Sequence, residues 1–150
     1  HPMAVSSLEE LSEGVFHNVI GEVDELPAKD VKRVVMCSGK VYYDLLKERR
    51  DREQDEVAII RIEQLYPFPA EEVADIMKDY QHVKDFVWCQ EEPQNQGAWY
   101  SSQHHFWAAI PSGAQLTYRG RDASAAPAVG YLSEHNKQQQ KLVDEALTIK

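Results

Sequence analysis

The run VVMCSGKVYYDLL, residues 34–46, decides the fold, because it joins a buried strand to a helix through a glycine-containing turn. Residues 34–37 are continuously apolar and mostly β-branched, which is typical of a strand buried on both faces. Ser38 and Gly39 then open a helix that we expect over about residues 40–52. Its buried face is predicted to consist of Val41, Tyr42, Leu45 and Leu46.

The same alternation of strand and helix continues toward the C-terminus. A strand at 57–62 is followed by a helix from Pro69, whose apolar face carries Val73, Ile76, Met77 and Tyr80. We then predict a strand at 83–90, a loop at 91–97, a helix at 98–110, a strand at 116–119 and an irregular stretch at 120–130. The last helix is capped by Ser133, and its apolar stripe consists of Leu142, Val143, Ala146 and Leu147. Continuously apolar strands that alternate with helices predict a mostly parallel sheet, covered on both faces, in a three-layer α/β/α domain.

Residues 1–30 form a lead-in to this alternation, and residues 31–150 are expected to be the core of a single domain. Ser7 and Glu10 make a capping-box pattern, so a short helix should follow and end near Gly14. Residues 19–23 predict a strand at an edge or interior position, and it is the one candidate for an antiparallel strand.

Composition limits the classes of function. The chain has 150 residues, is 43% hydrophobic and 27% charged, and carries a net charge of −9, as expected for a globular domain. That charge argues against nucleic acid or an anionic membrane as the main partner. No apolar run approaches the roughly 20 residues of a membrane span, and no signal peptide is visible. Because the chain begins His-Pro-Met, we expect an internal segment of a longer protein.

The two cysteines, Cys37 and Cys89, lie far apart in the sequence and both end apolar runs. Buried free thiols are the simplest expectation. Two cysteines do not make a secreted disulfide framework, and reduced thiols favour a cytoplasmic protein.

Unusual residues follow three of the predicted strands, in the loops at 37–40, 63–69 and 90–97. In open parallel sheets, ligands and partners meet the carboxyl ends of the strands, which makes this rim the candidate functional region. Ser38-Gly39-Lys40 has the ending of a phosphate loop, but Val34 and Val41 stand where the full pattern needs Gly and Ser or Thr. A plain helix start is therefore favoured there.

No residue pattern predicts catalysis or metal binding. Glu91 and Glu92 directly follow a predicted strand, and adjacent residues in extended chain point to opposite faces, so they make a poor carboxylate pair. His104 and His105 diverge by about 100° on a helix and cannot easily share one zinc ion. No nucleophile motif of the G-x-S-x-G type occurs.

The chain carries more aromatic residues near this rim than a small domain needs, and aromatic side chains are enriched at interfaces. They are Tyr66, Phe68, Trp99, Tyr100, Phe106 and Trp107. Arg119 and Arg121 lie two apart on a predicted strand, so they face one way and could bind a phosphate or a carboxylate; ordinary salt bridges are the alternative.

Four motifs, in order and spacing, resemble one known family. They are VVMCSGKVYYDL (34–45), RIEQLYPFP (61–69), WCQEEPQNQGAW (88–99) and YRGR (118–121) with SAAPAVG (124–130). Across essentially all 150 residues the chain resembles the C-terminal domain of the thiamine-diphosphate-dependent first component of the 2-oxoglutarate dehydrogenase complex. It is similar, more distantly, to the last domain of transketolases and pyruvate dehydrogenases.

The resemblance implies a much longer homodimeric subunit that uses thiamine diphosphate and magnesium to decarboxylate 2-oxoglutarate. The succinyl group would pass to a lipoyl arm of the succinyltransferase component. It also implies the transketolase C-terminal fold, a five-stranded mixed sheet with one antiparallel strand. The family's catalytic and cofactor-binding residues lie in preceding domains, so none is carried over to this chain, which alone should be inactive.

The role expected for this domain is assembly, as dimer surface and support for the preceding domains. The candidate interface residues are Glu91, Glu92, Asn95, Gln96, Trp99, Tyr66 and Phe68. A regulatory domain is the alternative, with a nucleotide or acyl-coenzyme A effector held by Lys40, Arg119 and Arg121. A free-standing flavodoxin-like module is a third reading, for which the sequence offers no cofactor fingerprint.

Overall fold

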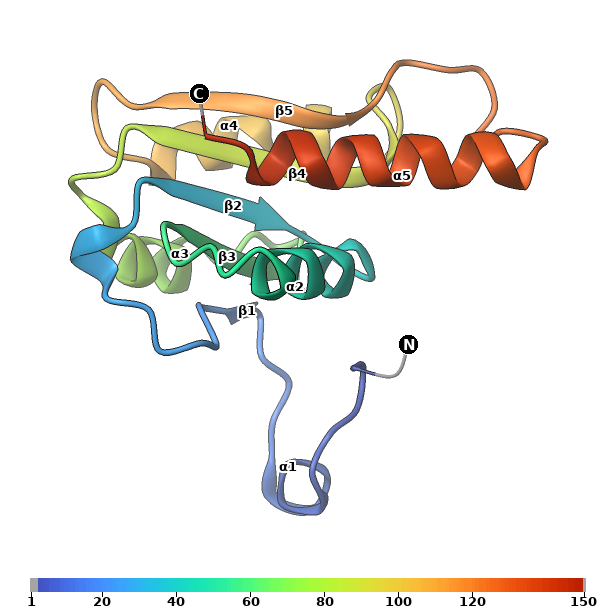
Figure 1. The fold of residues 1–150 in the computed structure, drawn as a ribbon. Helices are drawn as coiled ribbons and strands as arrows, with labels where there is room; N and C mark the ends of the chain where they lie inside the picture. Colours follow the sequence, from blue (N-terminus) through green and yellow to red (C-terminus); the bar gives the residue numbers. More distant parts are fainter. Residues whose placement is uncertain (1–2, 150) are drawn as a thin grey trace.

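The five-stranded mixed sheet is the centre of the fold in a computed structural model that describes residues 3–149 (Figure 1). The strand order is β1-β3-β2-β4-β5. Its strands are β1 (Val19–Ile20), β2 (Arg33–Cys37), β3 (Val57–Ile62), β4 (Asp85–Pro93) and β5 (Gln115–Arg121). β1 pairs antiparallel with β3, and the other pairings are parallel. The predicted mixed α/β/α fold is confirmed.

Helices cover both faces of the sheet. They are α2 (Val41–Asp51) and α5 (Leu132–Leu147) on one face, α3 (Ala70–Met77) and α4 (Trp99–Ala109) on the other, the outlying α1 (Leu8–Glu13), and the short 3-10 helices η1 (Ala28–Asp30) and η2 (Lys78–Tyr80). Successive strand residues point to opposite faces, so Val34 and Met36 enter one core while Val35 and Cys37 enter the other. Among residues 3–149 no helix is both long and apolar enough to cross a membrane.

Several element boundaries differ from those predicted. β4 continues to Pro93 through an irregularity in its pairing with β5, so Glu91 and Glu92 belong to a strand rather than a loop. The strand predicted at 19–23 stops at Ile20. Ser133 does not cap α5, which begins one residue earlier, after Tyr131, without a side-chain cap.

The capping box at the start of α1 is confirmed. The Ser7 hydroxyl accepts a hydrogen bond from the Glu10 N–H at 3.1 Å, and the Glu10 carboxylate accepts one from the Ser7 N–H at 2.7 Å. The helix ends at Gly14 as expected. None of its residues is buried, and it projects away from the sheet (Figure 1).

The C-terminal end of α5 is fixed by Arg33, a buried arginine of β2. Its guanidinium donates to the carbonyl oxygens of Ala146 and Thr148 at 3.0 and 2.6 Å, and to Asp85 at 2.8 Å. The last carbonyls of a helix have no partner within the helix, so this arginine satisfies them. The final helix is thereby held to the sheet.

A second buried arginine, Arg49 of α2, fastens residues 22–24 to the edge of the sheet. It donates to Glu22 at 2.8 Å, to Asp24 at 2.5 Å and to the Val57 carbonyl at 2.9 Å. The second oxygen of Glu22 accepts the Ile59 N–H at 2.8 Å. The Glu22 carboxylate thus accepts the Ile59 N–H in place of the backbone carbonyl of a longer edge strand, which explains why β1 is only two residues long.

Asp24 predicts an acid-sensitive contribution to stability. Its hydrogen bonds to Arg50 and Arg49 lower its pKa from 3.8 to about 2. Because the folded pKa lies below the unfolded one, the stabilisation is complete above about pH 5 and is lost as the pH falls through 4 toward 2. We expect Asp24→Asn to lower the urea midpoint at pH 6 and to do so progressively less at pH 4 and pH 3. A difference from wild type that stays constant with pH would contradict this.

Candidate interface at the carboxyl ends of the strands

Gln90, near the end of β4, organises the turn that follows it. Its side chain is buried, and its oxygen accepts hydrogen bonds from the Trp88 indole N–H at 2.9 Å and the Trp99 backbone N–H at 3.0 Å. Its amide nitrogen lies 2.8–3.2 Å from three backbone carbonyls, those of Glu92, Pro93 and Gln96. One buried side chain therefore joins the strand, the turn and the start of α4.

Two glycines allow this close packing. Gly97 has a φ of +65°, and a Cβ there would lie 3.0 Å from the Gln90 amide nitrogen. A Cβ at Gly120 would lie 2.3 Å from the Tyr118 hydroxyl oxygen, which is itself within hydrogen-bonding distance of the Glu92 and Arg121 carbonyls. A side chain at either position would force the turn apart.

The turn is also tied to the stretch after β5. The side-chain amides of Asn95 and Gln96 donate to the Ser124 carbonyl at 3.0 and 2.9 Å, and the Asn95 oxygen accepts the Ser124 N–H at 2.9 Å. Asn95 and Gln96 were predicted as interface residues. Their amide groups are engaged within the domain, where they shape its surface.

The other predicted interface residues divide into exposed and buried. Glu92 is exposed and Tyr66 is 92% exposed, so both are open to a partner. Phe68 is partly buried and stacks on His105, with 4.5 Å between ring centroids. Trp99 is only 8% exposed and packs against Tyr118 at 5.5 Å, so its side chain belongs to the core. The expectation that Trp99 itself forms a surface is not met.

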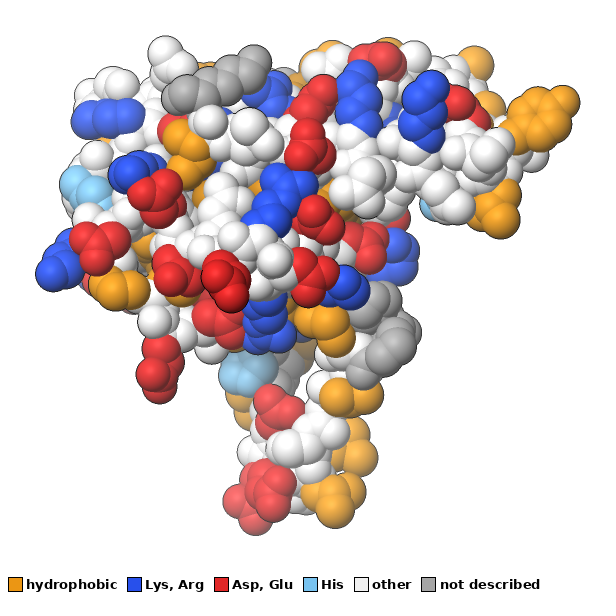
Figure 2. All heavy atoms as spheres, viewed as in Figure 1, with side chains coloured by type: hydrophobic (Ala, Val, Ile, Leu, Met, Phe, Trp, Pro, Cys, Tyr) orange, Lys and Arg blue, Asp and Glu red, His pale blue; other side chains and the backbone are white. Residues whose placement is uncertain are grey.

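Large exposed apolar side chains also occur at places that the sequence reasoning did not select. They are Val5, Leu8, Leu11, Val15 and Phe16 in and around α1, and Tyr131 and Leu132 at the start of α5, whereas Tyr100 and Trp107 on α4 are exposed and belong to the aromatic set noted in the sequence. In Figure 2 such side chains gather on the projecting α1 and at the far end of α5. A sequence signal existed for α1, because its leucines are three residues apart with no core element to receive them.

Lys40 lies apart from the arginines with which it was grouped. It forms ion pairs with Glu91 at 2.9 Å and with Asp44 at 3.1 Å. Partial burial would lower the pKa of Lys40, but these hydrogen bonds outweigh burial and raise it. Its charge is therefore already neutralised inside the domain, and the segment from Ser38 to Lys40 is the plain helix start that the sequence favoured.

Arg119 and Arg121 both lie on the face of β5 that α5 covers, as their spacing predicts. Arg119 pairs in register with Cys89, whose side chain is in the core under α2 and α5. Arg121 is within hydrogen-bonding distance of His135 and Gln139 on α5. Gln139 in turn donates to Asp44, the partner of Lys40, so the three predicted cations are linked only indirectly.

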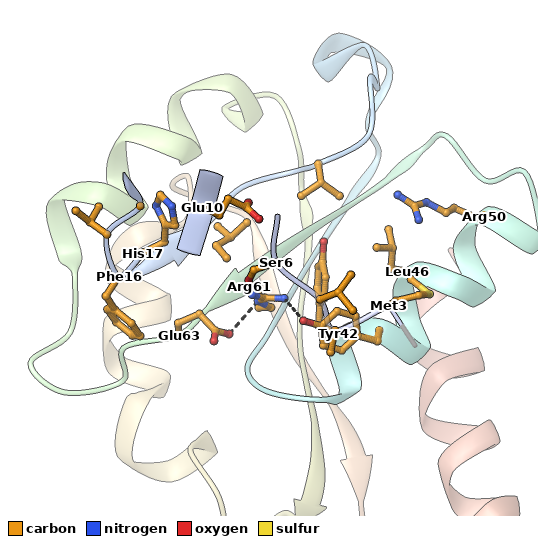
Figure 3. Close-up of a pocket in the computed structure, with 17 residues that line it drawn as sticks. Met3, Ser6, Glu10, Phe16, His17, Tyr42, Leu46, Arg50, Arg61 and Glu63 are labelled. Carbon is orange, nitrogen blue, oxygen red and sulfur yellow. Dashed lines mark hydrogen bonds and ion pairs between the residues drawn. The ribbon is translucent and has the colours of Figure 1, made fainter. Parts of the chain in front are cut away.

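A cavity of about 670 Å³ separates the N-terminal arm, residues 3–17, from α2 and β3 (Figure 3). Arg61 crosses its floor, donates to the Tyr43 hydroxyl at 3.0 Å, and lies 3.0 Å from the Glu63 carboxylate. Its guanidinium also lies 4.7 Å from the centre of the Tyr42 ring, a cation–π contact. Burial raises the pKa of Tyr42 to about 12, so it stays protonated.

The described residues contain no set of three His, Cys, Asp or Glu side chains placed to hold a metal ion. The rings of His104 and His105 lie 3.9 Å apart, and His105 is taken up by its stack on Phe68. The floor of the cavity holds a neutralised arginine and a protonated tyrosine.

Cys37 and Cys89 are buried and form no disulfide, although they are register partners in the neighbouring strands β2 and β4. Burial raises the pKa of both Cys37 and Cys89. Since the thiolate is the reactive form, we expect neither to react with a thiol reagent at pH 8 until the protein unfolds. Rapid labelling of the native protein would contradict this, and labelling in 6 M guanidinium is the control.

The fold is similar to that of a solved protein structure. The chain is similar in structure to a split-gene transketolase, described as an inactive β4 tetramer, with a TM-score of 0.58 and 13% sequence identity. The match covers 90% of this chain and 44% of that one. The chain therefore has the fold of a transketolase-like α/β domain.

The particular family is 2-oxoglutarate dehydrogenase C-terminal, whose model matches residues 5–147, and the chain belongs to it. Similar proteins are the 2-oxoglutarate dehydrogenase E1 components of Haemophilus influenzae, 66% identical, and Azotobacter vinelandii, 55% identical, each over 99% of this chain. The chain spans 16% of the length of each of these relatives.

Proposed function

We propose that this chain is the C-terminal assembly domain of a 2-oxoglutarate dehydrogenase E1 subunit. The observation that carries the proposal is the match over 99% of this chain, at 66% identity, to an E1 component of which it is 16%. The surface supports an assembly role, because Leu8 and Leu11 of α1, a helix with no buried residue, and Val15 just after it are 77–81% exposed. Apolar surface of this kind usually marks an interaction site.

The activity of the complete subunit would be the oxidative decarboxylation of 2-oxoglutarate, with thiamine diphosphate and magnesium as cofactors. The residues described here do not fit that cofactor. A magnesium-bound diphosphate needs oxygen ligands and free cations, whereas the cavity floor holds Arg61, already paired with Glu63. We therefore place cofactor binding and catalysis in the rest of the subunit, and expect the chain alone to be inactive.

The partners that we propose are the preceding domains, a second E1 subunit and the lipoyl-bearing succinyltransferase component. Glu92, Tyr66 and the turn held by Gln90 form the candidate contact surface at the strand ends, with Glu91 bound to Lys40 behind it. We propose a cytoplasmic location, which the two free buried cysteines support. The regulatory alternative gains no support, since Lys40 is neutralised by two carboxylates.

The test uses an antibody raised against this chain, applied to a lysate of the source cell. We expect a band several times larger than 17.2 kDa, and depletion with the antibody should remove 2-oxoglutarate-dependent succinyl-coenzyme A formation. Pre-immune serum is the control, and pyruvate dehydrogenase activity should remain. A band at 17.2 kDa, or activity that survives complete depletion, would refute the proposal.

A further inference from the structure

Two arginines lack a carboxylate partner in a chain with an excess of acidic residues. The chain has seven arginines and a net charge of −9. Five form ion pairs within the domain: Arg33, Arg49, Arg50, Arg52 and Arg61. Among residues 3–149 no carboxylate lies at ion-pair distance from Arg119 or Arg121. Since acidic groups are abundant in the chain, we expect Arg119 and Arg121 to be available to an anion from outside it.

Arg121 is the more constrained of the two. It is only 9% exposed, its guanidinium lies 3.2 Å from His135 Nδ1, and it donates a hydrogen bond to the Gln139 side-chain oxygen at 3.1 Å. Its Nε is buried and has no hydrogen-bond partner among the described residues. A buried charge without a counter-ion is costly, so a group that compensates it would bind favourably.

Arg121 borders a cavity of about 240 Å³ between the end of β5 and α5. One wall is the stretch after β5, whose small side chains Ala123, Ala126 and Ala128 leave room for an inserted group. The other wall is α5, which contributes Lys141, a second cation with a largely exposed side chain. Asp122 also borders the cavity, but it forms no ion pair with Arg121.

Exposed apolar side chains follow the wall of this cavity along the chain. Val129, which lines the cavity, is 36% exposed, and Tyr131 and Leu132, at the start of α5, are 80% and 74% exposed. Figure 2 shows hydrophobic side chains at this end of the molecule. A small anion would leave these side chains in water, whereas a protein segment would cover them.

We infer that Arg121 and this cavity receive a carboxylate side chain from the part of the E1 subunit that lies outside this chain. The inference rests on the proposed function. The chain is 16% of the length of its relatives, so most of such a subunit is available as the occupant. An Asp or Glu flanked by apolar residues would pair with the guanidinium while its neighbours cover Tyr131 and Leu132.

The test compares this chain with the complete subunit from the same gene, using Arg121→Gln and the matched control Lys137→Gln, which removes one charge from an exposed position of α5. In the chain alone, Arg121→Gln should leave the melting temperature unchanged or raise it, because it removes an uncompensated buried charge. In the complete subunit the same variant should lower it. The control should change neither.

Hydrogen exchange locates the effect. In the complete subunit, amides of residues 122–132 should exchange at least tenfold more slowly than in the chain alone, and Arg121→Gln should remove that protection. Equal exchange rates in the two proteins would overturn the inference while leaving the proposed function intact. If no longer subunit exists, the proposed function itself fails.

Two further measurements exclude other occupants. Acetate and inorganic phosphate are titrated into the chain alone while the Arg121 Nε–H resonance is followed by NMR. Saturation at low millimolar concentration would reassign the site to a free anion and overturn the inference. In the chain alone, hydrogen exchange at residues 122–132 should not slow as the protein concentration is raised. Slowing would assign the cavity to a second copy of the chain and overturn the inference.

Discussion

Replacement of Arg49 by methionine is expected to lower the free energy of unfolding by about 3–5 kcal/mol. The guanidinium is 2% exposed and neutralises Glu22, whose side chain is 8% exposed. Methionine fills similar volume but leaves the Glu22 carboxylate buried without a cation. It also removes a donor to the Val57 carbonyl at the start of β3. Urea denaturation followed by tryptophan fluorescence measures the loss.

Arg50→Met is the matched control for this prediction. Arg50 is the next residue, also binds Asp24, and is 49% exposed, so its loss should cost at most about 1 kcal/mol. The double change Glu22→Gln with Arg49→Met should recover part of the loss, because the amide still accepts the Ile59 N–H without a buried charge. Equal losses in the two single variants would contradict the argument.

The strands and their two cores could be predicted from the sequence, because burial leaves a periodic trace in it. Residues 34–37 and 57–62 read as continuous apolar runs, and both faces of β2 and β3 are buried. The face of α2 was predicted at Val41, Tyr42, Leu45 and Leu46, all of which are buried. The strand at residues 19–23 was predicted from its own residues as the candidate antiparallel strand, and the family resemblance implied that the sheet has one such strand, as β1 shows.

The ion pairs between distant residues could not be predicted, because only the strand order brings those residues together. Lys40 and Glu91 are 51 positions apart and meet because β2 and β4 are neighbours. Without that knowledge, Lys40 looks like a free cation at a helix start. The buried role of Arg49 was hidden for the same reason, since it lies in a charged run that is typical of an exposed helix end.

Trp99 shows why the sequence alone did not predict which candidate interface residues are exposed. A tryptophan after a polar turn suggests an exposed aromatic, and nothing local contradicts that reading. Its burial depends on Gln90, nine residues before it, and on Tyr118 of β5. By contrast Tyr66 and Glu92 are exposed, as an interface requires.

Gln90→Leu is expected to lower the free energy of unfolding by about 3–4 kcal/mol, since it leaves several buried groups without hydrogen bonds that each cost about 1–3 kcal/mol. Leucine has similar size, so little packing is lost. The Trp88 indole N–H, in a fully buried side chain, and the Trp99 N–H lose their common acceptor. The carbonyls of the turn lose their donor.

The control for Gln90→Leu is Gln96→Leu, which removes one hydrogen bond to Ser124 at the surface and should cost less than about 1 kcal/mol. If Gln90 shapes the contact surface as well as the core, its variant should also speed hydrogen exchange at residues 91–99 by at least tenfold under conditions where the rest of β4 stays protected. A loss of stability without local opening would make Gln90 a core residue only, and the turn would then be held in place by Asn95 and Ser124, whose two mutual hydrogen bonds span it from outside.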